Sequence, residues 1–383
     1  MGKILVCGGD GYLGWPTSMH FAALGHDVMS VDNYLRRDLC RNTDSDPLFA
    51  VPSLPERARL FEEKTGNRVN VEIVDLADAR AVEHLFAKFV PDTIVHFAEQ
   101  PSAPYSMRGF DEADLTLRNN LTVTHNLVWA MLRFAPEAHM IKLGTMGEYG
   151  TPNIDIEEGW IDINHKGRED RFLFPRQASS LYHTTKVLDT DLLWFFVRTY
   201  GIRVTDLMQG PVYGLETEET KADPRLRPCF NYDDIFGTVV NRFLVQAVAG
   251  VPLTVFGKGG QTRGYLNIRD TMQCITLAAN NPPDAGKLEI YNQFTETFSV
   301  NELAELVCEA GSRLGIDVAV KSITNPRKEK EDHYYNPAHS ALLDLGLEPN
   351  YISIDMLAHM MEEVRQHKDA IDERRIMPRV SWS

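Results

Sequence analysis

Short apolar runs alternate with longer amphipathic stretches over the first half of the chain. The runs at 3–7, 27–31, 69–74, 93–98, 139–143 and 203–207 have the length and composition of buried strands. Apolar positions recur at helical spacing over 16–24, 54–65, 78–89 and 111–134, and a further helix is expected to begin after Ser179 as its cap. Strands that alternate with helices in this way predict a parallel sheet covered by helices on both faces.

After residue 208 the alternation loosens, and we expect a second, smaller domain there. The predicted fold is α/β, with a Rossmann-type doubly wound parallel sheet in 1–208 and a mixed α/β domain in 209–383. Segments at about 235–256 and 287–312 are expected to return to the first domain. Residues 151–178 are rich in acidic residues, Gly and Pro, and we expect them to form a long loop that overhangs the site.

Composition narrows the classes of protein that the chain can belong to. The net charge of -15 over 383 residues argues against general nucleic-acid binding, because no basic block offsets it. Five scattered cysteines without a C-x-x-C pair fit reduced thiols. No apolar run reaches about 18 residues and no signal or transit peptide precedes the first strand, so we expect a cytoplasmic protein without a membrane segment. No metal site is predicted.

A glycine-rich turn follows the first strand. Gly8, Gly11 and Gly14 lie between that strand and a helix, where they allow a tight turn and close approach of the backbone to a pyrophosphate. Asp32 ends the second strand and is placed to accept hydrogen bonds from both hydroxyls of an adenosine ribose. The motif predicts dinucleotide binding, and Asp32 favours NAD over NADP. Arg36 and Arg37 follow closely and leave NADP open as an alternative.

Other residues are expected to line the same cofactor site, most of them because they flank the glycines or the ends of the strands, and Asn120 because a helix carries it to those ends. Asp75 and Leu76 end the third strand, where they are suited to contact adenine. The remaining candidates are Asp10, Tyr12, Leu13, Asn33, Ala98, Glu99, Asn120, Gln209 and Val212.

Thr145, Tyr182 and Lys186 are the candidates for chemistry. Tyr182 and Lys186 are four residues apart, so on a helix they share one face. A phenol has a pKa of about 10, and an ammonium one turn away favours the phenolate that can act as a base. Thr145, at the end of a strand, can hold the oxygen whose proton is removed. This equipment suits oxidation of an alcohol, although Y-x-x-x-K also occurs by chance.

The second half of the chain holds candidates for binding a diphosphate. The segment 257–266 mixes Gly with Lys258 and Arg263, which suits a diphosphate that the backbone approaches closely; a plain glycine hairpin is the alternative. Arg327 is a second candidate cation.

Together, the glycine fingerprint, Asp32, Thr145 and Tyr182-x-x-x-Lys186 resemble the extended short-chain dehydrogenases/reductases that act on nucleotide sugars. The segments 8–12, 102–107, 142–158, 177–180, 257–266, 292–296 and 376–378 resemble the branch of that family that makes a sulfonated sugar nucleotide. The resemblance implies a tightly held NAD, UDP-glucose and sulfite as substrates, and a homodimer. A partner protein that supplies sulfite stays open.

The resemblance also implies roles for individual residues. Thr145, Tyr182 and Lys186 would be catalytic, and Tyr182 and Lys186 would also contact NAD. The expected substrate contacts are Gln100, Ser102, Thr145, Gln177, Tyr182, Gln209, Asn241, Thr254, Gln261, Arg263, Arg327 and Glu331.

The residues after Thr145 depart from one neighbouring group of enzymes. Sugar 4,6-dehydratases commonly carry Asp-Glu there, whereas this chain has Met146 and Gly147, neither of which transfers a proton. Glu148 and His183 are then the nearest candidates for the acid and base of an elimination. A UDP-sugar 4-epimerase, a 4,6-dehydratase and a regulatory protein that only binds NAD remain the alternative predictions.

Overall fold

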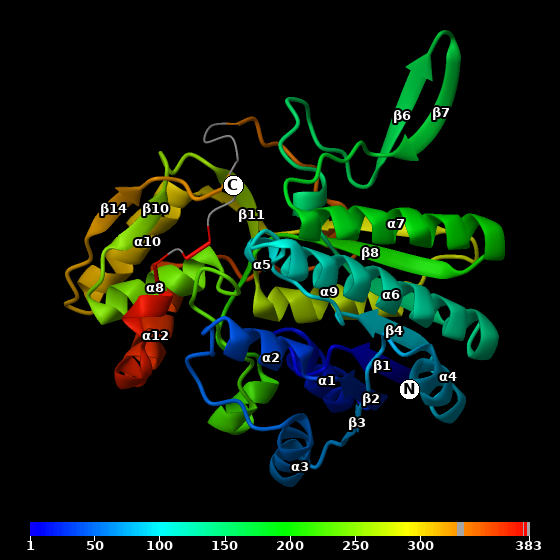
Figure 1. Ribbon diagram of the computed structural model, residues 1–383, viewed down its shortest axis with the longest axis horizontal. Coiled ribbons are helices and arrows are strands. Elements are labelled where there is room, and N and C mark those ends of the chain that lie inside the picture. The colour runs from blue at the N-terminus through cyan, green and yellow to red at the C-terminus, as the bar shows by residue number, and fades with distance from the viewer. Residues whose placement is uncertain (328–332, 378, 381–383) are drawn as a thin grey trace.

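A seven-stranded parallel sheet forms the centre of the larger part of the molecule (Figure 1). The computed structural model describes residues 1–327, 333–377 and 379–380. The apolar runs become strands because both faces of the sheet are covered, which requires side chains of both pleats to be buried. In the order in which they pair, the strands are β12 (Leu288–Gln293), β8 (Arg203–Gln209), β5 (His139–Thr145), β4 (Thr93–His96), β1 (Lys3–Cys7), β2 (Asp27–Asp32) and β3 (Val69–Ile73).

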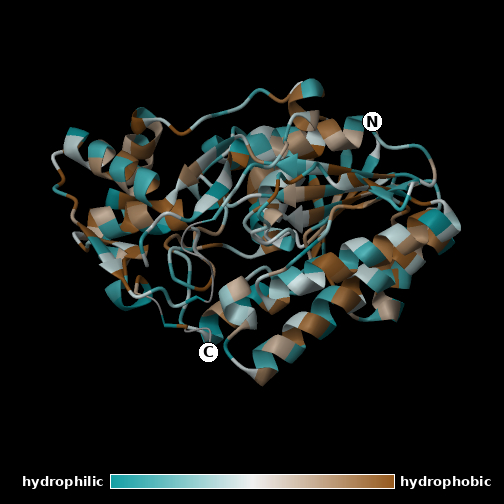
Figure 2. Cartoon of the chain, turned by 90° about the horizontal axis from the view of Figure 1, so that it is seen from above, coloured by the Kyte–Doolittle hydropathy of each residue, from teal (hydrophilic) through white to brown (hydrophobic). Residues whose placement is uncertain are grey.

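Two layers of helices enclose this sheet, which lies between them in Figure 2. One face packs against a core with side chains from α1 (Gly14–Ala23), α3 (Leu54–Thr65) and α9 (Ile268–Asn280). The other face packs against α4 (Ala79–Lys88), α6 (Phe110–Phe134) and α7 (Leu181–Tyr200). The predicted α/β class with a doubly wound parallel sheet is confirmed.

A smaller lobe has a core of its own. Its helices are α8 (Val239–Ala249), α10 (Val300–Arg313) and α12 (Ile354–Arg365), which pack together. Two small sheets complete it: β10 (Leu253–Phe256) with β14 (Val320–Ile323), and β13 (Glu296–Ser299) with β11 (Thr262–Asn267) and β9 (Val212–Tyr213). The shorter elements of the chain are α2 (Leu35–Asn42), α5 (Ala103–Ser106), α11 (Ala341–Asp344) and the 3-10 turns Met146–Glu148, Glu219–Ala222, Pro224–Leu226, Lys368–Ala370 and Glu373–Arg375.

The chain crosses between the two parts differently from the prediction. The segment 235–256 was expected to return to the large sheet, but β10 pairs with β14 and α8 packs in the core of the smaller lobe. Of 287–312, only β12 joins the large sheet, because α10 packs against α8 and α12. Helix α9 also returns to the larger part of the molecule, where it packs against one face of the large sheet. The boundary at residue 208 itself stays a prediction.

Two local predictions were wrong. The segment 151–178 is not a plain loop, since β6 (Trp160–His165) and β7 (Arg168–Leu173) form an antiparallel hairpin that projects from the body (Figure 1). The cap of α7 is Ser180 rather than Ser179, because the Ser180 hydroxyl accepts the backbone N–H of His183 at 3.2 Å.

The strand order fixes where a ligand can bind. β2 and β3 lie on one side of β1, and the chain then crosses from β3 to β4 on its other side, so the strand order reverses beside β1 and opens a crevice at the carboxyl ends of the strands. The glycine turn after β1 and the segment after β4 border this crevice. None of the described helices is long and apolar enough to cross a membrane.

Candidate active site

A cavity of about 850 Å³ lies over the carboxyl ends of the strands, with walls from both parts of the molecule. It gathers most of the residues that the sequence singled out. These are Gly8, Gly11, Tyr12, Leu13, Gly14, Asp32, Asn33, Arg36, Asp75, Leu76, Ala98, Glu99, Gln100, Ser102, Thr145, Tyr182, His183, Gln209, Val212, Asn241, Gln261, Arg263 and Arg327.

The glycine turn leaves no room for a side chain. Gly8 has φ of +87°, and a Cβ on it would lie 2.8 Å from the carbonyl carbon of Phe97. A Cβ on Gly14 would lie 2.0 Å from the carbonyl oxygen of Gly8. Helix α1 begins at Gly14, so its free amide groups and its dipole are directed at the cavity wall. This cradle fits the pyrophosphate of a dinucleotide.

Asp32, the residue expected to contact an adenosine ribose, lies in the wall of the same cavity. Its carboxylate accepts backbone N–H groups from Asp10 at 2.9 Å and Tyr34 at 2.6 Å, which hold it at the cavity wall. Burial, together with the nearby Asp10 carboxylate, raises the pKa of Asp32 to about 6. The group is therefore an ionised acceptor at neutral pH, as a site for two ribose hydroxyls requires.

Asp10 and Arg37 do not line the cavity, contrary to the prediction for their side chains. The Asp10 carboxylate is buried between Arg37 and the fully buried Arg57, each at 2.6 Å. Arg37 also donates to the carbonyl oxygens of Val51 and Pro52. These contacts brace the segment after β2, so Arg37 is committed to the protein instead of a 2′-phosphate. Arg36 lines the cavity and donates to Asn231 at 2.7 Å.

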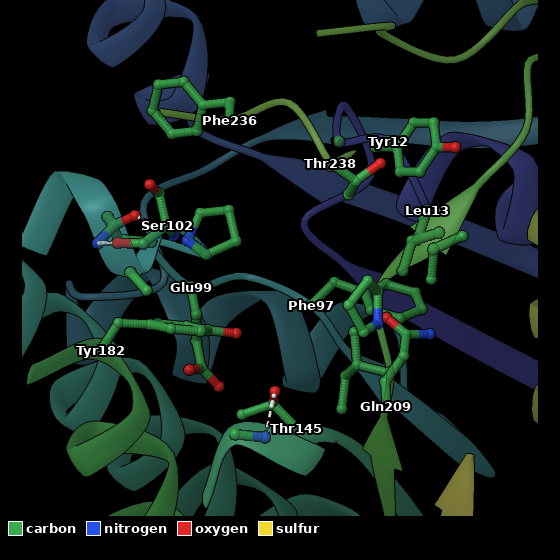
Figure 3. A pocket seen from close by; sticks show the side chains of 18 of the residues that line it. Tyr12, Leu13, Phe97, Glu99, Ser102, Thr145, Tyr182, Gln209, Phe236 and Thr238 are labelled. Atoms are coloured by element: carbon green, nitrogen blue, oxygen red, sulfur yellow. Dashed lines mark hydrogen bonds between the residues drawn. The ribbon is translucent and has the colours of Figure 1, made fainter. Parts of the chain in front are cut away.

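Tyr182, Thr145 and Glu99 face the same part of the cavity (Figure 3). Tyr182 is in the first turn of α7, and its backbone N–H donates to the Ser106 hydroxyl. Thr145 is the last residue of β5, and its hydroxyl accepts a hydrogen bond from the backbone N–H of Gly147 at 3.2 Å. The structure thus brings together two of the three predicted catalytic groups at the cavity surface.

Lys186 lies behind this surface instead of lining it. Its side chain is 4% exposed, and its ammonium donates to the carbonyl oxygen of Leu143 at 2.7 Å and forms an ion pair with Glu99 at 2.7 Å. The ammonium is 6.0 Å from the centre of the Tyr182 ring. Burial raises the pKa of Tyr182 above its ordinary value, and the Glu99 carboxylate adds to the rise. The expectation that Lys186 favours the phenolate of Tyr182 stays a prediction.

Glu148 is not at the cavity surface, which corrects its prediction as an acid or base. The 3-10 turn after Thr145 carries its carboxylate back to the Thr145 N–H at 3.2 Å and to the buried Lys142 ammonium at 3.3 Å. Arg176 and Thr190 also contact it. Glu148 therefore belongs to a buried charge cluster beneath the site.

His183 does line the cavity, next to Gly147. A Cβ on Gly147 would lie 2.4 Å from the His183 Nε2, so only glycine admits the ring there. The other ring nitrogen lies 3.1 Å from the Ser180 hydroxyl. Burial and the positive charges of Arg327 and Arg263 lower the pKa of His183 to about 3, so the imidazole is neutral.

The remaining substrate candidates divide into two groups. Gln261 lines the cavity and donates to the Phe256 carbonyl at 2.9 Å. Thr254 does not line it, because its hydroxyl accepts from Gln246 inside the smaller lobe. Gln177 is exposed and Asn120 is buried, where Asn120 joins the backbone of Gln100 to Thr185. Glu331 lies outside the described residues.

Several residues of the cavity were missed from the sequence. Phe97, Asn119, Phe236, Thr238, Arg242 and Tyr335 also line it. Of these, Arg242 had a signal in the sequence, because it is the only charged residue of helix α8, and its side chain is buried.

Comparison with known proteins agrees with this geometry. The model of the NAD dependent epimerase/dehydratase family matches residues 4–292. The structure of the UDP-glucose 4-epimerase from Thermotoga maritima with UDP-glucose covers 95% of this chain and 99% of its own, at 21% identity and a TM-score of 0.70. The 4-epimerase from Bifidobacterium longum with NAD⁺ and UDP covers 96% and 98%, at 19% identity and a TM-score of 0.71. These likenesses show the fold.

Two curated relatives are much more similar. UDP-sulfoquinovose synthase, chloroplastic, from Spinacia oleracea is 49% identical over 99% of this chain and 79% of its own length. UDP-sulfoquinovose synthase from Sulfolobus acidocaldarius is 42% identical over 99% of this chain and 97% of its own. The chain therefore belongs to the NAD dependent epimerase/dehydratase family and, within it, to the UDP-sulfoquinovose synthases. The resemblance noted in the sequence and the expectation of an enzyme are confirmed.

Proposed function

We propose that this enzyme holds NAD and converts UDP-glucose and sulfite into UDP-sulfoquinovose and water. The observation that carries the proposal is that Tyr182, Thr145 and the glycine cradle line the same cavity, with no proton-transferring side chain at 146 or 147. The similarity to the two named synthases supports the same substrates.

The residues that would hold NAD are those of the glycine cradle and the strand ends. Gly8, Gly11 and Gly14 would admit the pyrophosphate, and Asp32 would accept from the adenosine ribose. Asp75 and Leu76 line the wall beyond Asp32, where they would contact adenine. When bound, NAD supplies an acceptor and later a donor of hydride.

Tyr182 and Thr145 act on the C4 oxygen of the glucose. The Thr145 hydroxyl orients the C4 hydroxyl, and Tyr182 takes its proton while C4 loses a hydride. The resulting ketone acidifies the proton on C5, and loss of that proton with the C6 hydroxyl gives a conjugated 4-keto-5,6-ene. The sulfur lone pair of sulfite adds at C6, and C5 regains a proton. Return of hydride to C4 and of the proton from Tyr182 leaves the sequence redox-neutral.

His183 is the residue that we assign to the proton on C5. Glu148 is buried beneath the site, whereas His183 lines the cavity, with one ring nitrogen beside the Ser180 hydroxyl and the other, Nε2, beside Gly147. Met146 and Gly147 leave the neighbouring wall small and uncharged. Such a wall does not repel a sulfite anion, as two carboxylates would.

The test is to incubate the purified protein with UDP-glucose and sulfite and to measure the product mass. We expect the mass for a hydroxyl replaced by a sulfonate. Unchanged mass would point to a 4-epimerase, and loss of water alone to a 4,6-dehydratase; either result would refute the proposal. Tyr182→Phe is the matched control, because it should keep bound NAD yet form no product.

We also propose that the enzyme is a homodimer. Trp129 on α6 and Phe195 on α7 are 44% and 47% exposed, and Trp129 contacts the ring of Tyr200. These side chains make an apolar face on two long neighbouring helices, the kind of surface that a second copy covers.

A further inference from the structure

Glu99 is a buried carboxylate at the centre of the site. It follows β4, its side chain is 2% exposed, and it lines the cavity. Figure 3 shows it between Tyr182 and Thr145. Neither of its oxygens accepts a well-directed hydrogen bond from the described residues. A buried carboxylate in this state requires a compensating charge.

The compensating charge is that of Lys186, whose ammonium lies 2.7 Å from Glu99. The other titratable neighbours contribute less. His96 lies 3.3 Å from Glu99, and burial lowers its pKa to about 4, so the ring is neutral. Burial raises the pKa of Asp189 well above its ordinary value, which favours the neutral acid. Lys142 also faces the cluster, but Asp206 and Glu148 neutralise it.

This pairing changes what Lys186 can do for Tyr182. An ammonium next to a phenol normally favours the phenolate. Here the carboxylate of Glu99 is as close to that ammonium as a hydrogen-bonded partner, so the two charges largely cancel at the phenol. The phenol of Tyr182 is then left without a net positive charge nearby to favour the phenolate. An oxidised nicotinamide carries such a charge.

We propose that Glu99 is a positioning residue of this reaction: it holds the Lys186 ammonium and keeps Tyr182 protonated unless an oxidised nicotinamide is beside it. The inference rests on the proposed function. The proton that Tyr182 takes from the C4 hydroxyl is then retained while the nicotinamide is reduced. It is still on the phenol when hydride returns to C4, so the ketone is reduced with the same proton and none is needed from solvent.

The test is the pH dependence of NADH formation when UDP-glucose is added without sulfite, followed by absorbance. Removing a negative charge beside a phenol lowers its pKa, so Glu99→Gln should reach half of its maximal rate at least about one pH unit below the wild type. Glu99→Asp, which keeps the charge, should restore most of the wild-type profile. Glu72→Gln, which removes the same charge far from the cavity, should leave the profile unchanged.

A second measurement is independent of substrate. The ultraviolet absorbance of the Tyr182 phenolate, taken as the difference from a matched Tyr182→Phe protein, should appear at lower pH in Glu99→Gln. If Glu99→Gln does not fold, the same measurement is made on Lys186→Met. Loss of the ammonium should then raise the pH at which the phenolate absorbance appears. A profile within 0.2 pH unit of the wild type in the variants would overturn the inference. Failure to form a carbon–sulfur bond would count only against the proposed function.

Discussion

Single residues decide what the site can accept. Gly147 is the clearest case, because its missing side chain is what allows the His183 ring to reach the cavity wall. The same residue removes one of the two acids that a dehydratase carries at this strand end. This one glycine therefore takes the place of a carboxylate and makes room for the residue that we assign to the C5 proton.

Gly147→Ala should separate the two halves of the reaction. The added methyl group would displace the His183 ring, whose atoms are the nearest to that position, so NADH formation from UDP-glucose, which we assign to Thr145 and Tyr182, should persist. Formation of the sulfonated product should fall at least about tenfold, equivalent to ~1.4 kcal/mol in the barrier. Gly109→Ala is the control, since the nearest atom there belongs to the flexible Glu112 side chain. A wild-type yield of product would contradict the assignment of His183.

The affinity for NAD should depend on pH through Asp32. Its pKa of about 6 means that acidification below that value protonates the group and weakens its acceptance from the ribose hydroxyls. The dissociation constant, measured by calorimetry, should therefore rise as the pH falls from 7 to 5. Asp32→Asn should bind NAD more weakly and lose most of this dependence. An unchanged dependence in that variant would place the titrating group elsewhere.

At the scale of elements, a buried charge cluster fastens the site to the sheet. Lys142 of β5, 0% exposed, contacts Asp206 of β8 at 3.1 Å and Thr190 of α7 at 2.7 Å, as well as Glu148. It also donates to the carbonyl oxygen of Lys186. The cluster fixes α7, and with it Tyr182, over the ends of two strands.

Lys142→Met should destabilise the protein strongly. It leaves the carboxylates of Glu148 and Asp206 buried without their ammonium, which typically costs about 3–5 kcal/mol. Lys88→Met breaks an exposed ion pair with Glu72, so its cost should be within about 1 kcal/mol. Urea unfolding of the two variants measures the difference. Similar midpoints would show that the buried cluster contributes little.

The elements that the sequence predicted are those whose pattern follows from burial. Strands β1, β4 and β8 are buried on both faces, so their apolar runs mark them directly. Helix α2 was missed because it is short and half of its residues are charged. The β6–β7 hairpin was missed because it is held by turn geometry without a buried face. Glu148 was misplaced since distance along the chain does not show which way a 3-10 turn directs a side chain.

At the scale of the whole molecule, the cavity depends on both lobes. Asp32 and Tyr182 come from the large sheet and its helices, whereas Arg263 and Gln261 come from the smaller lobe. The candidate cofactor end could be read from local motifs. The substrate end could not, because it depends on how β10, β11 and α8 pack against the sheet.

The proposed dimer can be tested by placing charged side chains on the apolar face of α6 and α7. Trp129→Glu combined with Phe195→Glu places two carboxylates on the exposed face of α6 and α7, so a protein that sediments as a dimer should become a monomer. Tyr351→Glu, at a residue 57% exposed in the smaller lobe, is the control and should not change the sedimentation coefficient. A wild-type protein that sediments as a monomer would refute the dimer.

The projecting hairpin separates Thr145 from Tyr182 along the chain, yet the two meet at the cavity. Its tip, where Lys166 and Gly167 both have positive φ, touches neither lobe in Figure 1. The tip is therefore a natural place to cut or extend the polypeptide: trypsin should nick the native enzyme there first, and a short epitope inserted between these two residues should be tolerated without loss of turnover.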